Sequence, residues 1–192
     1  MAEPKLILAS TSPRRRELLA QIGFYPEVVS SNAVELHDPN LTARELCLIN
    51  AHRKAKAVAL EYPDNTILAA DTLVYLGTTL YGKPHSHAEA ITMLTELQGQ
   101  THLVITGVCL MYGRGHRKNI FAETTLVKFR PLNCQQIEDY LSKINPLDKA
   151  GGYAIQEFGE MIVHSIEGSY SNVIGLPLEQ LQRAWNDWVK LF

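Results

Sequence analysis

Residues 5–19 read KLILASTSPRRRELL, and this stretch places a strand, a turn and a helix in direct succession. The four apolar residues 6–9 predict a short buried strand. Pro13 suits the first position of a helix, because its φ is fixed and it lacks an N–H. Ser12 before it is a natural N-cap. We therefore expect a strand-to-helix turn whose hydroxyl groups lie at the N-terminus of the helix.

The first turn of this helix is rich in positive charge. It carries three consecutive arginines, residues 14–16, although cations at a helix N-terminus oppose the helix dipole. Free N–H groups at that end attract anions, and guanidinium groups present paired donors that match phosphate oxygens. An ordinary turn with solvated arginines is the alternative. Because the three charges call for something negative to offset them, the turn predicts a local anion site.

The composition limits the partners of the chain. It has 192 residues, of which 46% are hydrophobic and 20% charged, which is normal for a globular protein. Lys and Arg number 18 against 20 Asp and Glu, so the formal net charge is −2. This balance gives no global attraction to a nucleic acid polymer or to an anionic membrane. The length allows one full α/β domain or two small lobes around a cleft.

The cysteines and the apolar runs predict a cytoplasmic protein. Cys47, Cys109 and Cys134 are odd in number and widely spaced, which is typical of reduced thiols rather than of a disulfide framework. The apolar run after Lys5 is too short for a signal peptide. No apolar segment approaches the roughly 20 residues that span a bilayer.

Strand and helix signals are mixed along the chain. Thr42 and Glu45 form a capping-box pattern that opens a helix to about Tyr62. Strands are expected at residues 26–29, 66–70, 73–76, 101–111, 119–129, 161–166 and 169–173. The run 73–76 is either a separate strand or a continuation of 66–70. This mixture, with a long hairpin, predicts a two-lobed α/β or α+β domain.

Asp71 is the first candidate for chemistry. It follows four apolar residues and so lies at the expected C-terminal end of a buried strand, where open α/β sheets bind ligands. A carboxylate there can hold a metal or take a proton from water. The alternative is that Asp71 caps a turn through Thr72.

Four other polar side chains are weaker candidates when each is considered alone. Lys54 is one of several charges on a helix, and Glu35 is a lone acid in a loop. Lys83 lies between a glycine and a proline in a fixed turn, which suits a phosphate. Gln156 follows two glycines, where the backbone could approach a ligand closely. Its amide could read the edge of a base or be satisfied within the fold.

In this order, these pieces resemble the Maf family of nucleoside triphosphate pyrophosphatases, from Leu6 to the final helix. The resemblance rests on five motifs, LASTSPRR (8–15), AADT (69–72), GKP (82–84), DKAGGYAIQ (148–156), and EGSY (167–170) running into VIGLP (173–177). It implies an α/β fold akin to the inosine triphosphate pyrophosphatases. That fold is a two-lobed mixed sheet with flanking helices and a central cleft, formed here by one domain over residues 1–192.

The implied reaction is hydrolysis of a nucleoside triphosphate to the monophosphate and pyrophosphate, with a divalent cation such as Mg²⁺ or Mn²⁺. The resemblance places the catalytic aspartate at Asp71 and an acidic loop position at Glu35, and these two would hold the metal. It places the phosphate-binding positions at Ser10, Arg14, Arg15, Lys54 and Lys83.

The subgroup that prefers dTTP and UTP is similar to this chain at Arg14, Thr72 and Gln156. The sister group that acts on 7-methyl-GTP tends to carry Trp at the first of these positions. This chain departs from the family pattern at Val34, Arg53, Glu157 and Glu160. These departures leave the metal ligands and the exact nucleotide open.

We therefore expect an enzyme that hydrolyses dTTP and UTP, with water activated by Asp71. The alternatives are a pyrophosphatase for 7-methyl-GTP or another modified or purine nucleotide, and a non-catalytic nucleotide-binding regulator of cell division. Asp71 argues against the regulator, because a pure binder has less need of a carboxylate among phosphates. A homodimer is possible. The terminal amphipathic helix with Trp185 and Trp188 is expected to cover the core instead.

Overall fold

The computed structural model describes residues 5–113 and 116–191. The chain divides into two compact units, each made of separate segments. Unit 1 comprises residues 1–71, 106–123 and 175–192, and unit 2 comprises residues 72–105 and 124–174. The expectation of one functional domain over the whole chain stays a prediction.

Seven strands within the described residues form a mixed sheet. They are β1 (Leu6–Leu8), β2 (Glu27–Val28), β3 (Thr66–Leu76), β4 (Thr79–Tyr81), β5 (Thr101–Tyr112), β6 (Arg117–Phe129) and β7 (Val163–Glu167). Their order is β2-β1-β3-β5-β6-β7, and β4 pairs with β3. β1 is parallel to β2 and β3, whereas β4 and β7 are antiparallel to their partners. The expected mixed α/β class is confirmed.

Six α-helices accompany these strands in the described part of the chain. They are α1 (Pro13–Gln21), α2 (Ala43–Glu61), α3 (His87–Leu97), α4 (Cys134–Leu141), α5 (Tyr170–Ile174) and α6 (Leu178–Val189). The Thr42–Glu45 capping box at the start of α2 is present as expected. Ser12 is the N-cap of α1, although its side chain makes no capping hydrogen bond. None of the described helices has the length and apolar character needed to cross a membrane.

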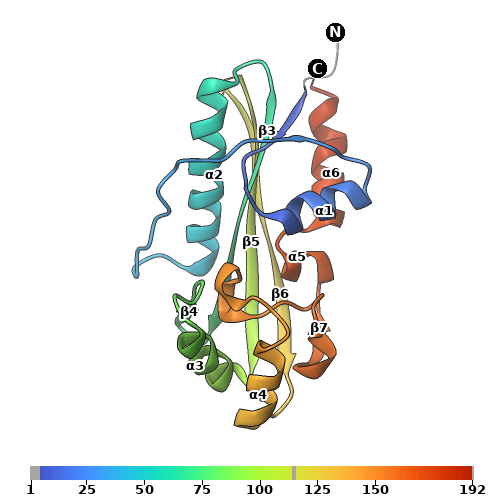
Figure 1. Ribbon diagram of the computed structural model, residues 1–192. Helices are drawn as coiled ribbons and strands as arrows, with labels where there is room; N and C mark the ends of the chain where they lie inside the picture. The colour runs from blue at the N-terminus through green and yellow to red at the C-terminus, as the bar shows by residue number, and fades with distance from the viewer. Residues whose placement is uncertain (1–4, 114–115, 192) are drawn as a thin grey trace. The chain divides into compact units, whose positions relative to one another are not determined.

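Helices cover both faces of the sheet in unit 1. Ile67 and Ala69 of β3 pack against α2 in one buried cluster. Successive side chains of a strand point to opposite faces, so Thr66 faces away from α2. There its hydroxyl accepts a hydrogen bond of 3.2 Å from the indole of Trp188 on α6. Figure 1 shows α2 on one side of these strands and α1 and α6 on the other. Trp188 thus covers the core, as expected.

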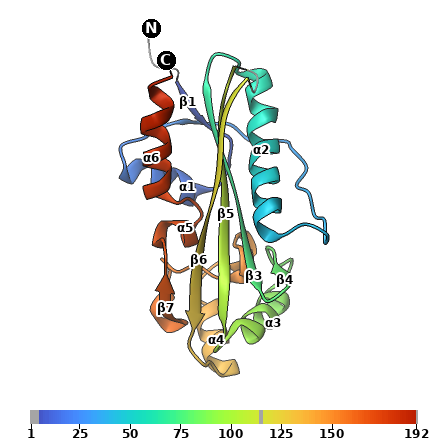
Figure 2. The same cartoon turned by 180° about the vertical axis from the view of Figure 1, so that it is seen from behind.

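Gly107 on β5 sets how closely α2 approaches the sheet. A Cβ at this position would lie 2.5 Å from the carbonyl carbon and oxygen of Cys47 and 2.8 Å from the nitrogen of Leu48. These are backbone atoms in the first turns of α2, so they cannot rotate out of the way. A residue without a side chain is therefore required where the helix crosses β5. In Figure 2, β5 and β6 run side by side in the view from behind.

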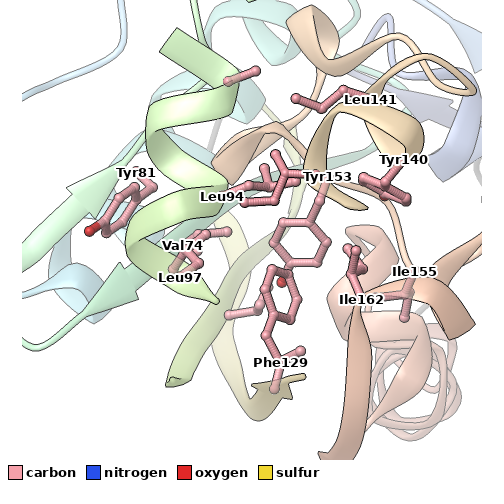
Figure 3. Close-up of a cluster of buried hydrophobic side chains, with 14 residues drawn as sticks. Val74, Tyr81, Leu94, Leu97, Phe129, Tyr140, Leu141, Tyr153, Ile155 and Ile162 are labelled. Carbon is pink, nitrogen blue, oxygen red and sulfur yellow. The ribbon is translucent and has the colours of Figure 1, made fainter. Parts of the chain in front are cut away.

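Unit 2 is built around a core that contains several aromatic rings (Figure 3). Phe129 and Tyr153 meet edge to face with 4.8 Å between ring centroids. The hydroxyl of Tyr153 also lies 2.7 Å from Nε2 of the buried His102. The hydroxyl of Tyr140 donates to the carbonyl of Ala154 and accepts from its N–H, both at 2.9 Å. These contacts fix the segment that leads to Gln156.

Two expectations for the secondary structure are wrong. Asp71 does not lie at the C-terminal end of its strand, because residues 73–76 continue the strand, which was one of the two expected alternatives, and β3 runs without a break to Leu76, with β4 paired to its second half. Residues 169–173 are not a strand, since α5 occupies residues 170–174. Gly168 turns the chain with φ 119°, and the Ser169 hydroxyl then accepts a hydrogen bond from the N–H of Asn172, as at a helix start.

Candidate active site

Asp71 lies on β3 beyond the end of its parallel partner. The last paired residues of β1 and β3 are Leu8 and Leu68, and the N–H of Ala9 donates to the carbonyl of Leu68. Asp71 therefore lies near the end of the parallel ladder, although it is in the middle of a strand. By alternation with Ala69 its side chain faces α2. It is 4% exposed, so its charge is largely removed from water.

Lys54 of α2 compensates this buried carboxylate. Its Nζ lies 2.6 Å from Oδ1 of Asp71 and also 2.6 Å from Oε1 of Glu35. The side chain of Asp71 is 6% exposed and that of Lys54 is 15%, whereas that of Glu35 is 46%. The ammonium group is thus shared by a buried and a half-exposed carboxylate. The structure brings together these three residues, which are widely separated in the sequence.

Asn50 completes this group, and sequence reasoning missed it. Its Nδ2 donates to Oδ2 of Asp71 at 3.3 Å. The same amide binds the backbone of Leu36, next to Glu35. The signal that could have found it is its spacing, because residues four apart lie on one face of a helix. Asn50 precedes Lys54 by four positions.

Ser10 and Arg15 form a second group at the β1–α1 turn. The hydroxyl oxygen of Ser10 accepts from the N–H of Ser12 at 3.2 Å and from Nη1 of Arg15 at 3.1 Å. Nε of Arg15 donates to the carbonyl of Gly175 at 2.9 Å. Because two donors already occupy the lone pairs of the Ser10 oxygen, the hydroxyl group can bind a further partner only as a donor.

Electrostatics connect the two groups. Burial lowers the pKa of Arg15, while the charge of Asp71 raises it and the charge of the neighbouring Arg14 lowers it. A guanidinium group stays protonated in spite of such a shift. Ser10, Arg14, Arg15, Lys54, Glu35 and Asp71 all belong to unit 1. This unit therefore places a buried carboxylate among cations and beside the N-terminus of α1.

The three remaining candidates, Thr72, Lys83 and Gln156, belong to unit 2. Thr72 is half-buried and follows Asp71 on β3, and Lys83 is exposed. The carbonyl of Gly82 accepts from the N–H of Gly151 at 2.9 Å, so the turn with Lys83 adjoins the start of the segment with Gln156. Within this unit, the structure brings the two motifs together.

The side chain of Gln156 is exposed rather than held inside the fold. Its Nε2 lies 3.5 Å from Oε1 of Glu157, a long distance for a hydrogen bond. Glu157 in turn faces the buried Lys149 at 3.4 Å, and Lys149 bonds more closely to Asp148 at 2.8 Å. The amide of Gln156 is thus accessible to a ligand, next to one of the acids that depart from the family pattern.

The acidic pair fits a divalent cation. Glu35 and Asp71 each place a carboxylate oxygen 2.6 Å from Nζ of Lys54. The two carboxylates therefore converge on one position, which a cation occupies. No cluster of three or more His, Cys, Asp or Glu side chains suited to a metal occurs in residues 5–113 or 116–191. Mg²⁺ is commonly bound by one or two carboxylates, with substrate phosphates and water as further ligands. Two carboxylates are therefore the kind of donor set that Mg²⁺ takes in such sites.

Such a fold and site define a class of α/β proteins equipped to bind a polyanion beside a buried carboxylate. The chain belongs to the Maf-like protein family, whose model matches residues 5–188. The expected family is thus confirmed.

Relatives match nearly the whole chain. A protein of Akkermansia muciniphila is 45% identical over 183 residues, which cover 95% of this chain and 96% of the relative. One of Gloeobacter violaceus is 48% identical over 177 residues, 92% of each chain. One of Pyrococcus furiosus is 45% identical over 177 residues, 91% of this chain and 90% of the relative. All three relatives carry the name dTTP/UTP pyrophosphatase.

Proposed function

We propose that this protein is an enzyme that hydrolyses dTTP and UTP to the nucleoside monophosphate and pyrophosphate. The observation that carries the proposal is the buried Asp71 carboxylate, held at 2.6 Å by Lys54 in a chain whose relatives are named for this reaction. A carboxylate beside cations can accept a proton from water while the cations neutralise the phosphates. The carboxylates of Asp71 and Glu35 also act on the charge of Arg15 in the first turn of α1.

We assign Asp71 the role of general base, which deprotonates or orients the attacking water. Arg14, Arg15 and Lys54, with the N-terminus of α1, would offset the charge of the triphosphate. Ser10 would donate its hydroxyl proton to a phosphate oxygen. Holding the α-phosphorus in line with the water in this way supplies orientation, which is a large part of catalysis.

The residues of unit 2 have roles that the family resemblance implies. Lys83, exposed in its turn, would bind phosphate. Gln156 would recognise the base, since its amide can pair with the O4 and N3–H of thymine or uracil. Thr72 would shape the base pocket.

We further propose that Glu35 and Asp71 hold Mg²⁺ or Mn²⁺. When bound, such an ion neutralises phosphate charge and polarises phosphoryl oxygens. The ammonium group of Lys54, 2.6 Å from both carboxylates, adds a further positive charge at this point.

A turnover panel tests the function. Pyrophosphate release would be measured with dTTP, UTP, CTP, inosine triphosphate and 7-methyl-GTP, and we expect dTTP and UTP to be the best substrates. Fast turnover of 7-methyl-GTP or a purine nucleotide would identify the alternative pyrophosphatase. Tight binding of dTTP with no pyrophosphate released over hours would identify a non-catalytic regulator.

The Asp71→Asn variant tests the assigned base. We expect turnover of dTTP to fall by roughly 10²–10⁴-fold, the usual loss when a general base is removed. Asp64→Asn is a matched control, because Asp64 is an exposed residue of unit 1 outside the site. Near wild-type turnover by Asp71→Asn would show that the base is wrongly assigned.

We also propose a cytoplasmic location, which three free thiols support. Fractionation of cells that express the protein at native level would test it. The homodimer stays a prediction, and sedimentation equilibrium would decide it.

A further inference from the structure

We propose that Asn50 is a positioning residue of this site, which ties the loop carrying Glu35 to the carboxylate of Asp71. The inference rests on the proposed function, in which Asp71 faces the reacting water. Asn50 itself would touch neither substrate nor metal. Its action would be exerted through the two acids.

The amide of Asn50 makes three hydrogen bonds. The residue is 2% exposed. Its Oδ1 accepts from the N–H of Leu36 at 2.7 Å, and its Nδ2 donates to the carbonyl of Leu36 at 3.2 Å. The second hydrogen of Nδ2 points to Oδ2 of Asp71 at 3.3 Å. Because a flipped amide would lose all three bonds, the orientation of this side chain is fixed.

These bonds act on both acids at once. Leu36 directly follows Glu35, so binding both its N–H and its carbonyl to α2 fixes the backbone that carries Glu35. Asp71 receives Asn50 on Oδ2 and Lys54 on Oδ1, so the plane of its carboxylate is set by two partners. Lys54 also contacts Glu35, since its Nζ lies 2.6 Å from Oε1 of that residue. The convergence of the two carboxylates on one point therefore depends on Asn50.

The test replaces Asn50 by a side chain of similar volume that cannot form these bonds. Asn50→Leu is the main variant, and Asn50→Ala serves if the leucine variant does not fold, as judged by circular dichroism. The matched control is Asn65→Ala, since the amide of Asn65 also bonds to a backbone carbonyl, that of Lys5, but is not part of the site. Three measurements are made: hydrogen exchange at the Leu36 amide, Mn²⁺ binding without nucleotide by electron paramagnetic resonance, and kcat/KM with dTTP.

We expect the Leu36 amide to lose protection in the Asn50 variant. Mn²⁺ affinity and kcat/KM should each fall by about 10–100-fold, as is usual when a group that orients metal ligands is removed. The number of Mn²⁺ sites per chain should not change. Partial unfolding would lower that number and leave the Kd of the remaining sites intact, so a raised Kd separates positioning from a merely structural role.

The proposal is overturned if a folded Asn50 variant keeps the Mn²⁺ affinity and the kcat/KM of the wild type. Failure of the proposed function gives a different pattern. Wild-type protein would then release no pyrophosphate from dTTP or UTP, while the Mn²⁺ Kd would still report on Asn50. If the wild type binds no Mn²⁺ but turns over dTTP, kcat/KM alone decides.

Discussion

The close approach of α2 to β5 makes Gly107→Ala the most informative single substitution outside the candidate site. The added Cβ would lie 2.5 Å from the backbone of Cys47, whereas ordinary contact begins near 3.4 Å. The start of α2 must therefore move by about 0.9 Å, the difference between these two distances. Overpacking of this kind costs roughly 1–3 kcal/mol, and the smaller entropy of the unfolded alanine chain returns about 0.4–1 kcal/mol.

The movement of α2 would also displace residues of the candidate active site. Asn50 and Lys54 lie on the α2 segment that follows Cys47, while Asp71 lies on β3 and does not move with the helix. A misplacement of about 1 Å can cost on the order of 10²-fold in rate. We therefore expect Gly107→Ala to lower kcat/KM with dTTP by roughly 10–100-fold, with a net stability loss of up to about 2.6 kcal/mol.

Urea unfolding followed by circular dichroism measures the stability, and pyrophosphate release with dTTP measures kcat/KM. Gly159→Ala is the control, because its Cβ would meet nothing nearer than 3.6 Å and its cost should stay below about 1 kcal/mol. Wild-type stability and activity in Gly107→Ala would refute the view that α2 is held in place by this glycine.

Two further predictions concern stability and pH. Burial lowers the pKa of His102 to about 4. Between this pH and about 6.5, the unfolded chain binds a proton at His102 that the folded chain does not bind. The free energy of unfolding should therefore fall by up to roughly 3 kcal/mol as pH drops through this range. Urea titrations from pH 7 to pH 4 should show this slope reduced in His102→Gln, and equal slopes would contradict the assignment. Thr42→Ala should cost about 1 kcal/mol at pH 7 by removing the N-cap of α2. Hydrogen bonds from Thr42 lower the pKa of Glu45. The stabilisation that comes from bonding Thr42 to the ionised Glu45 is therefore present above the usual pKa of a carboxyl group, and it is lost as pH falls through the lowered pKa. A penalty for Thr42→Ala that does not shrink in acid would contradict this.

The elements predicted well from the sequence are those fixed by local chemistry. The capping box of Thr42 and Glu45 starts α2 where expected, and the helix ends at Glu61, within a residue of the expected end. Side chains at such termini bond to backbone groups three residues away, so the signal and the structure lie in the same short stretch.

The contacts that could not be predicted join distant parts of the chain. The sequence left open whether residues 73–76 continue the strand that contains Asp71, because the pairing of that half with β4 is not encoded in the residues around Asp71. Arg15 and the carbonyl of Gly175 are 160 positions apart, and Asn50 reaches Asp71 across 21. No periodicity reports such pairs. The family resemblance named most of the candidate residues. The spacing of Asn50 and Lys54 places both on one face of α2, but it does not show that Asn50 bonds to Asp71.

The interleaved make-up of the two units has a consequence for how the protein can vary. Neither unit is a continuous stretch, since the backbone passes from one to the other after residues 71, 105, 123 and 174. Three of these junctions fall inside β3, β5 and β6. A single genetic crossover therefore cannot replace unit 1 or unit 2 by the corresponding unit of a related protein. Truncation at one end of the chain likewise cannot yield either unit alone. New substrate preferences in such a chain must arise by point substitution or by changes in loops, with both halves inherited together.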